Sequence, residues 1–102
     1  MSIIVAGIMR IDPANAEKAK AAVIKMMRAT RQEPGCRFYN ISADLEDGGT
    51  FHICEEWESE AALASHMQAP HMNEFKIALG GLGVRALDIK RYEASAGQPV
   101  SV

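Results

Sequence analysis

The 102-residue sequence is poor in cysteine and in aromatic residues, and it has no surplus of positive charge. The two cysteines, Cys36 and Cys54, lack CxxC spacing, which argues against a zinc ribbon and against a disulfide scaffold. We expect both to be small buried apolar residues. Eleven basic residues against thirteen acidic ones give a net charge of -2 without a basic cluster, so nucleic acid is not expected as a partner.

The sequence also has no apolar run that approaches the ~20 residues needed to span a bilayer. No charged and apolar leader is seen at the amino end, and we therefore expect a cytoplasmic protein without a membrane partner. Hydrophobic residues make up 48% of the chain, which is enough for the core of one domain. We expect that domain to cover residues 1–93 and to be followed by a small, polar and flexible tail at residues 94–102.

Four stretches have the pattern of strands. They are expected at Ile3–Ile11, Cys36–Ala43, Thr50–Glu58 and Val84–Tyr92. The first stretch is apolar almost without alternation, which is typical of a central strand covered on both faces. Between the first two strands, Asp12 and Pro13 predict a helix start, and Glu33-Pro34-Gly35 predicts the turn that ends this helix.

The second and third strands are expected to form a hairpin across the acidic, glycine-containing segment Leu45–Gly49. If the turn is centred near Asp47, Tyr39 lies opposite Glu55. A slip of one residue would bring Asn40 to that position instead. The sequence leaves both registers open.

Most of the reactive side chains fall between Phe51 and Phe75. Alternation along the third strand places Glu55 and Trp57 on the same face as apolar residues. A helix capped by Ser59 follows, and its spacing places His66 on the apolar stripe. Pro70 is expected to end that helix and to begin the next one, with His71 as a surface or helix-start residue and Phe75 on the apolar side.

The resulting order of elements, βαββαβ, predicts an α+β ferredoxin-like fold in which helices cover one face of a four-stranded antiparallel sheet. The two helical segments can cover only one face of such a sheet. Since the first strand is apolar on both sides, the other face is expected to carry a large apolar patch. A second copy of the chain is the simplest cover, so we expect a homodimer.

Two segments of the chain resemble the antibiotic biosynthesis monooxygenase (ABM) family, including its quinol monooxygenase-like members. They are EPGCRFYN at residues 33–40 and EEWESEAALASHMQAPHMNEF at residues 55–75. The resemblance implies a dimeric α+β barrel with a pocket between sheet and helices. Several relatives oxygenate aromatic polyketides or quinols with molecular oxygen and without metal or flavin, whereas others degrade haem or rearrange small phosphorylated ketones.

The family's strand glutamate, nearby aromatic residue and helix histidine match Glu55, Trp57 and His66, and its polar position on the second strand matches Asn40. Haem-degrading relatives have an asparagine on the first strand, where this chain has only residues 5–7, Val-Ala-Gly. Haem degradation is therefore disfavoured, although Trp57 and His66 partly resemble that group.

A cofactor-free oxygenase needs a base near the working pH, donors for the developing phenolate and a dry apolar pocket. His66 is the preferred base, and Glu55 is expected to orient His66 or to act itself. The competing interpretations are a hydrogen-bonded core histidine and an ion pair of Glu55 with Arg37 or Arg85.

The predicted substrate-binding residues share an aromatic, amide or flexible apolar side chain near the predicted base. They are Trp57, Asn40, Tyr39, Met67 and Phe75. Each also has a structural interpretation, as a core, sheet or interface residue. No metal site is predicted, because His66 and His71 are separated by a helix break and do not follow the i, i+4 spacing of a helical metal pair. No cofactor is predicted, because the sequence has no glycine-rich phosphate motif and the resemblance implies chemistry without metal or flavin.

These inferences lead to a cofactor-independent monooxygenase that acts on a quinol or another phenolic small molecule with molecular oxygen. One alternative is an isomerase of a small oxo compound that uses the same base. Another is a dimer that binds a ligand without catalysis.

Overall fold

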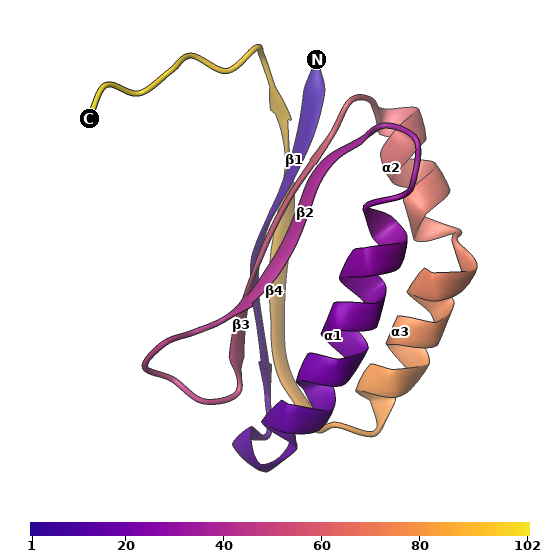
Figure 1. Cartoon of the computed structure of the whole chain (residues 1–102), viewed down its shortest axis with the longest axis vertical. Coiled ribbons are helices and arrows are strands. Elements are labelled where there is room, and N and C mark those ends of the chain that lie inside the picture. Colours follow the sequence, from indigo (N-terminus) through magenta and orange to yellow (C-terminus); the bar gives the residue numbers. More distant parts are fainter.

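The computed structural model covers residues 1–102 and contains a four-stranded antiparallel sheet with helices on one face (Figure 1). The elements in chain order are β1 (Ser2–Ile11), a 3-10 turn (Pro13–Asn15), α1 (Ala16–Thr30), β2 (Cys36–Ala43), β3 (Thr50–Trp57), α2 (Glu60–Met67), α3 (Pro70–Gly80) and β4 (Val84–Ala94). The spatial order of the strands is β2-β3-β1-β4. This is the predicted ferredoxin-like arrangement, with β1 in a central position.

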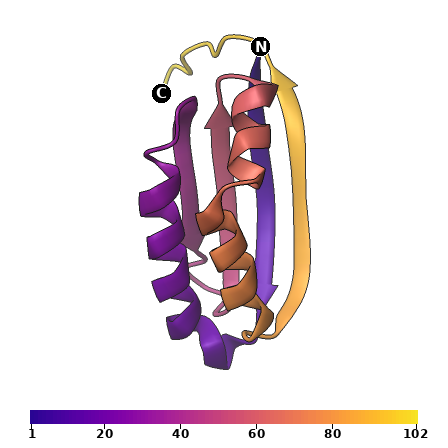
Figure 2. The same ribbon diagram turned by 90° about the vertical axis from the view of Figure 1, so that its right-hand side faces the viewer.

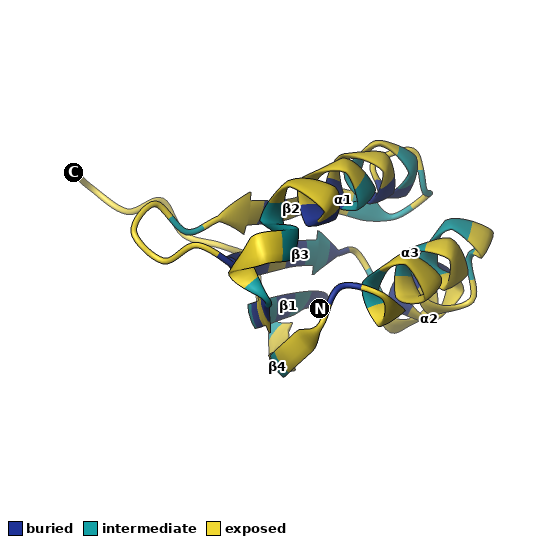
Figure 3. Cartoon of the chain, turned by 90° about the horizontal axis from the view of Figure 1, so that it is seen from below, coloured by how far each residue is buried: buried dark blue, intermediate teal, exposed yellow.

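The helices form a single layer against the sheet. Figure 2 shows α1 beside the α2–α3 pair, with β4 beyond both at the edge of the sheet. Viewed along the strands in Figure 3, the opposite face of the sheet carries no helix. Most residues of β4 are exposed, because no helix lies directly over this strand. The helix layer thus leaves one side of the interior open, and the candidate site lies there.

Local sequence signals account for the boundaries of the helices. The Asp12 carboxylate accepts a hydrogen bond from the Ala14 amide at 3.0 Å, and Pro13 follows it as the first residue of the 3-10 turn that precedes α1. The Ser59 hydroxyl accepts from the Ala62 amide at 3.1 Å at the start of α2. Pro70 is the first residue of α3. These helix starts agree with the predictions.

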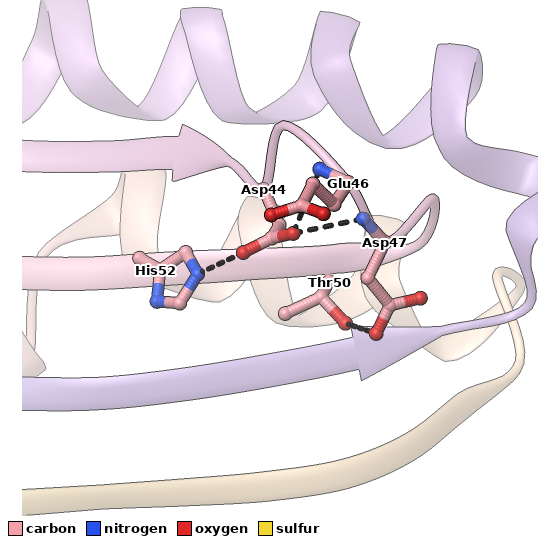
Figure 4. Close-up of polar contacts among 5 residues, drawn as sticks. All are labelled: Asp44, Glu46, Asp47, Thr50 and His52. Carbon is pink, nitrogen blue, oxygen red and sulfur yellow. Dashed lines mark hydrogen bonds and ion pairs between the residues drawn. The ribbon is translucent and has the colours of Figure 1, made fainter.

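The hairpin between β2 and β3 adopts the first of the two possible registers. Tyr39 is paired with Glu55, so that both side chains face the helices, whereas Asn40 faces the other way. The Asp44 carboxylate holds the turn: it accepts hydrogen bonds from two amides of the turn, at 3.0 and 2.8 Å, and contacts His52 Nε2 at 2.7 Å (Figure 4). The hydrogen bond from His52, followed by those from the amides, lowers the pKa of Asp44 to about 2.

The predictions for the two cysteines and for the end of the last strand need correction. Cys54 is exposed and Cys36 is only half-buried, because β3 directs Cys54 to the face without helices. The last strand extends to Ala94, two residues past its predicted end. Residues 95–102 have no regular secondary structure. None of the helices is long and apolar enough to cross a lipid bilayer.

The face without helices is less apolar than predicted. Its centre, on β1, is formed by the half-buried residues Ile4, Ala6 and Ile8. Because paired residues point to the same side of a sheet, the neighbouring strands add both apolar and polar side chains to this face. They are Phe38, Asn40 and Ser42 from β2, His52, Cys54 and Glu56 from β3, and Asp88, Lys90 and Tyr92 from β4. The face therefore has an apolar centre within a polar surround.

Gly7 is predicted to be essential for the pairing of β1 with β4. A Cβ atom at Gly7 would lie 2.0 Å from the Asp88 carbonyl oxygen and 2.6 Å from the Ile89 Cα atom. Backbone atoms cannot yield as a flexible side chain can, so Gly7→Ala should lower the free energy of unfolding by about 1–3 kcal/mol, measured by urea denaturation. Gly48→Ala is the matched control, since nothing lies within 4 Å of its Cβ position. Equal stability of the two variants would contradict this prediction.

Candidate active site

A cavity of about 480 Å³ lies between the sheet and the helices. Its walls are mostly apolar: β1 contributes Val5 and Met9, β3 contributes Ile53, and α3 contributes Met72 and Phe75. A cavity of this size with apolar walls and few polar groups is typical of a small-molecule binding site. The polar and ionisable side chains that line the interior therefore define the chemistry.

His66 lies near the end of α2 and is fully buried. Its ring lies between the Trp57 ring, at a centroid distance of 4.6 Å, and the Tyr39 ring, at 5.4 Å. His66 Nδ1 is 2.7 Å from Glu33 Oε2, and its Nε2 atom is buried without a hydrogen-bond partner. Because a carboxylate only accepts, Nδ1 carries the proton and Nε2 carries the free lone pair.

The protonation of His66 follows from two opposing effects. Burial lowers the pKa of His66, and the hydrogen bond and charge of Glu33 act in the opposite direction but do not cancel the effect of burial. The ring is therefore neutral at pH 7. His66 is one of the residues around the cavity, but its ring has no exposed surface and Nε2 is covered. A neutral imidazole that is held by a carboxylate can take up a proton at Nε2 once a substrate reaches that atom.

Glu55 is the second ionisable group in the cavity. Its Oε1 atom accepts a hydrogen bond from Trp57 Nε1 at 2.8 Å. Burial raises the pKa of Glu55 to about 7, and the hydrogen bond from Trp57 opposes this shift. Neither Arg37 nor Arg85 contacts Glu55, so the ion-pair interpretation is wrong. The reason is that Glu55 faces the helices, while both arginines pair with other carboxylates.

The predicted substrate-binding residues occupy different places. Tyr39, Met67 and Phe75 line the cavity. Trp57 is fully buried and does not line the cavity. Its indole contacts two residues that do, His66 and Glu55.

Asn40 lies on the other face of the sheet. Its side-chain oxygen accepts a hydrogen bond from Arg31 Nη2 at 2.9 Å. The strand register separates it from the cavity, since neighbouring residues of a strand point to opposite faces.

Sequence reasoning missed Glu33, which was interpreted only as part of a turn. Its Oε2 atom lies 2.7 Å from His66 Nδ1 and 2.7 Å from His71 Nε2. His71 is the second residue of α3, as expected for a helix-start residue, but only 21% of its side chain is exposed. Pro70 separates the two histidines in helical spacing, but their rings still lie 6.2 Å apart. α3 follows α2 within the same helix layer (Figure 1).

Glu33, His66 and His71 are also potential metal ligands, with one ligand atom from each within 4.8 Å of the others. Two histidines and a carboxylate are a common donor set for zinc or iron. The two nitrogen-to-oxygen contacts of 2.7 Å are, however, hydrogen-bond distances. They are shorter than the separation of about 3 Å or more between ligands that lie ~2.0–2.1 Å from one metal. The contacts are therefore those of a hydrogen-bonded cluster.

The raised pKa of Glu55 predicts a specific dependence of stability on pH. The folded chain binds this proton up to about pH 7, whereas the unfolded chain releases it near 4.5, so the free energy of unfolding falls as pH rises between these values. Glu55→Gln removes this titration and keeps an acceptor for Trp57. The variant should be more stable than the parent by about 1–3 kcal/mol at pH 8, with no difference at pH 4.5, in urea denaturation. A gap that does not change with pH would refute the assignment.

The family model described as "Antibiotic biosynthesis monooxygenase" matches residues 2–77. Among curated relatives, "Uncharacterized protein sll1783" from Synechocystis sp. is 31% identical over 94% of this chain and 65% of its own length. "Probable quinol monooxygenase YgiN" from Escherichia coli is 32% identical over 56% of this chain and 62% of its own length. The matches thus span less than two thirds of the length of either relative.

Solved structures agree with the fold. A structure from Deinococcus radiodurans, described as a "putative antibiotic biosynthesis monooxygenase", superposes with a TM-score of 0.89 at 31% identity and covers 99% of both chains. The structure of Rv0793 from Mycobacterium tuberculosis gives a TM-score of 0.85 at 24% identity and covers 97% of this chain and all of that one. With the family model matching about three quarters of the sequence, the chain belongs to the antibiotic biosynthesis monooxygenase family.

Proposed function

We propose that the protein is a cofactor-independent monooxygenase acting on a quinol or another phenolic small molecule. The observation that carries the proposal is an apolar cavity lined by a neutral histidine with a free Nε2 and by a carboxyl group with a pKa of about 7. Both are bases suited to neutral pH, and the surrounding walls are mostly apolar. The relative named as a quinol monooxygenase supports this choice of substrate class.

The proposed reaction begins with proton transfer from a phenolic hydroxyl to His66 Nε2. The resulting phenolate is electron-rich enough to reduce dioxygen, and a ring carbon then forms a bond to oxygen. Return of the proton from His66 gives a hydroperoxide. Loss of water across the C–H and O–O bonds leaves a carbonyl on the ring. The substrate loses four electrons, one oxygen atom enters the product and the other leaves as water, so no external reductant is needed.

The residues around His66 prepare it for this role. The Glu33 carboxylate accepts a hydrogen bond from the protonated Nδ1 of His66. It also stabilises the imidazolium that forms when Nε2 is protonated. Trp57 fixes the plane of the ring from one side and Tyr39 from another. Tyr39 also lines the cavity, and burial raises its pKa, so its hydroxyl stays protonated and can donate to a substrate oxygen. Glu55 is the second candidate base.

The central test is oxygen uptake by the full chain with a panel of quinols. His66→Gln should reduce turnover at least 100-fold, since a general base typically contributes 10² to 10⁴ in rate. Circular dichroism and thermal unfolding of the variant should show that it is folded. His52→Gln is the matched control, because His52 is exposed in the hairpin and paired with Asp44. Normal turnover by a folded His66→Gln variant would exclude His66 as the base.

A second substitution tests the role of Glu33. Glu33→Gln keeps an acceptor for Nδ1 but removes the negative charge that raises the pKa of His66. Its acidic limb of activity should therefore shift to lower pH, and kcat should fall. If no quinol is oxidised above the background rate, the oxygenase proposal fails. The two alternatives, isomerisation of a small oxo compound and ligand binding without catalysis, would then be tested directly.

A homodimer is part of this proposal. The sheet face without helices has Ile4, Ala6 and Ile8 at its centre, and two copies of this face can cover each other around a two-fold axis. Ala6→Glu would place a charge at the centre of that contact. This variant should sediment as a monomer, whereas the parent chain and the control Ala21→Glu, on the exposed side of α1, should sediment as dimers. A monomeric parent chain at micromolar concentration would refute the dimer.

A cytoplasmic location remains a prediction from the sequence.

A further inference from the structure

The rim of the cavity differs in charge from its interior. The interior walls are mostly apolar, but Lys76 of α3 and Arg91 of β4 also line the space. Lys90 borders it too, but its pairing with Ala6 directs its side chain to the face without helices. The only acidic group among the exposed lining residues is Glu60 of α2. Two cations against one carboxylate is a local excess of positive charge in a chain whose net charge is -2.

Ion pairing does not remove this excess. Arg91 pairs with Glu60, which links β4 to α2 across the cavity. Lys76 makes no ion pair within the chain. A lysine on a solvated surface needs no partner, but Lys76 borders an apolar space that can hold a small molecule. A charged ligand inside that space would bring a partner to Lys76.

The interior cannot supply a second binding place for an anion. Glu55 and Glu33 would both oppose a negative charge near the base, and the remaining walls are apolar. An anionic group would therefore be directed outward, to Lys76 and Arg91. An apolar aromatic body would be directed inward, against Phe75, Met72 and Ile53.

We infer that the cavity takes an aromatic molecule that carries a carboxylate, with its phenolic end at His66 and its carboxylate at the lysine and arginine side chains of the rim. This inference rests on the proposed function for the direction of the ring, and it extends that function by naming an anionic substrate class. Charge complementarity between rim and ligand supplies the orientation that apolar walls alone cannot give.

The test uses two ligands that differ only in the carboxylate, 1,4-dihydroxy-2-naphthoic acid and 1,4-dihydroxynaphthalene. Binding to the full-length protein is measured by calorimetry under anaerobic conditions, so that no turnover occurs. The acid should bind roughly tenfold more tightly, as expected for a charge-assisted contact. Its preference should shrink between 50 and 500 mM sodium chloride, because partly exposed charges are screened.

Two variants assign the effect to the rim. Lys76→Gln, and the double variant with Arg91→Gln, should remove most of the preference for the acid and leave the affinity for the uncharged ligand unchanged. Lys18→Gln, on the exposed side of α1, is the control and should bind both ligands like the parent. Equal affinity for both ligands in the parent, or a preference that survives in the double variant, would overturn the inference.

The outcome is separable from that of the proposed function. A carboxylate preference without oxygen uptake would support the anionic class and refute the oxygenase. Oxygen uptake with no preference between the ligands would do the reverse.

Discussion

The hydrogen bond from Trp57 Nε1 to Glu55 Oε1 is the contact on which the interior depends. A carboxyl group on the inner face of a sheet is costly unless it is neutral or paired, and no cation reaches this one. Instead, burial favours its protonated form, and a single indole donor offsets part of the desolvation. The same indole contacts His66, so one side chain positions both ionisable groups while remaining outside the cavity.

A single carboxylate in the helix layer, that of Glu33, positions both histidines of the site. Glu33 lies in the turn after α1, and it connects the end of α2 to the start of α3 through two hydrogen bonds. These contacts join three segments that are distant in sequence or separated by a helix break. The Glu33 carboxylate therefore has a structural role, in fixing the α2–α3 junction, and an electrostatic role at His66. One oxygen atom, Oε2, serves both roles.

Local signals in the sequence were sufficient for most of the fold. Capping by Ser59, the proline at position 70 and the pleat of β3 each act within a few residues, and the structure agrees with all three. Glu33 and His71 were not recognised as site residues, because their contact depends on how α3 turns back against α1. The exposure of Cys54 was missed for a different reason. Its burial was expected from the usual burial of free cysteine, whereas alternation with Glu55 and Trp57 places Cys54 on the face without helices.

The position of Trp57 has one more consequence. It is the only tryptophan of the chain, and it contacts the imidazole of the site while making no contact with solvent. The tryptophan fluorescence of the protein therefore comes from one known environment, without a contribution from other indoles. A change in charge on the neighbouring ring alters the field at this chromophore, so the molecule carries an intrinsic optical reporter of its own protonation state.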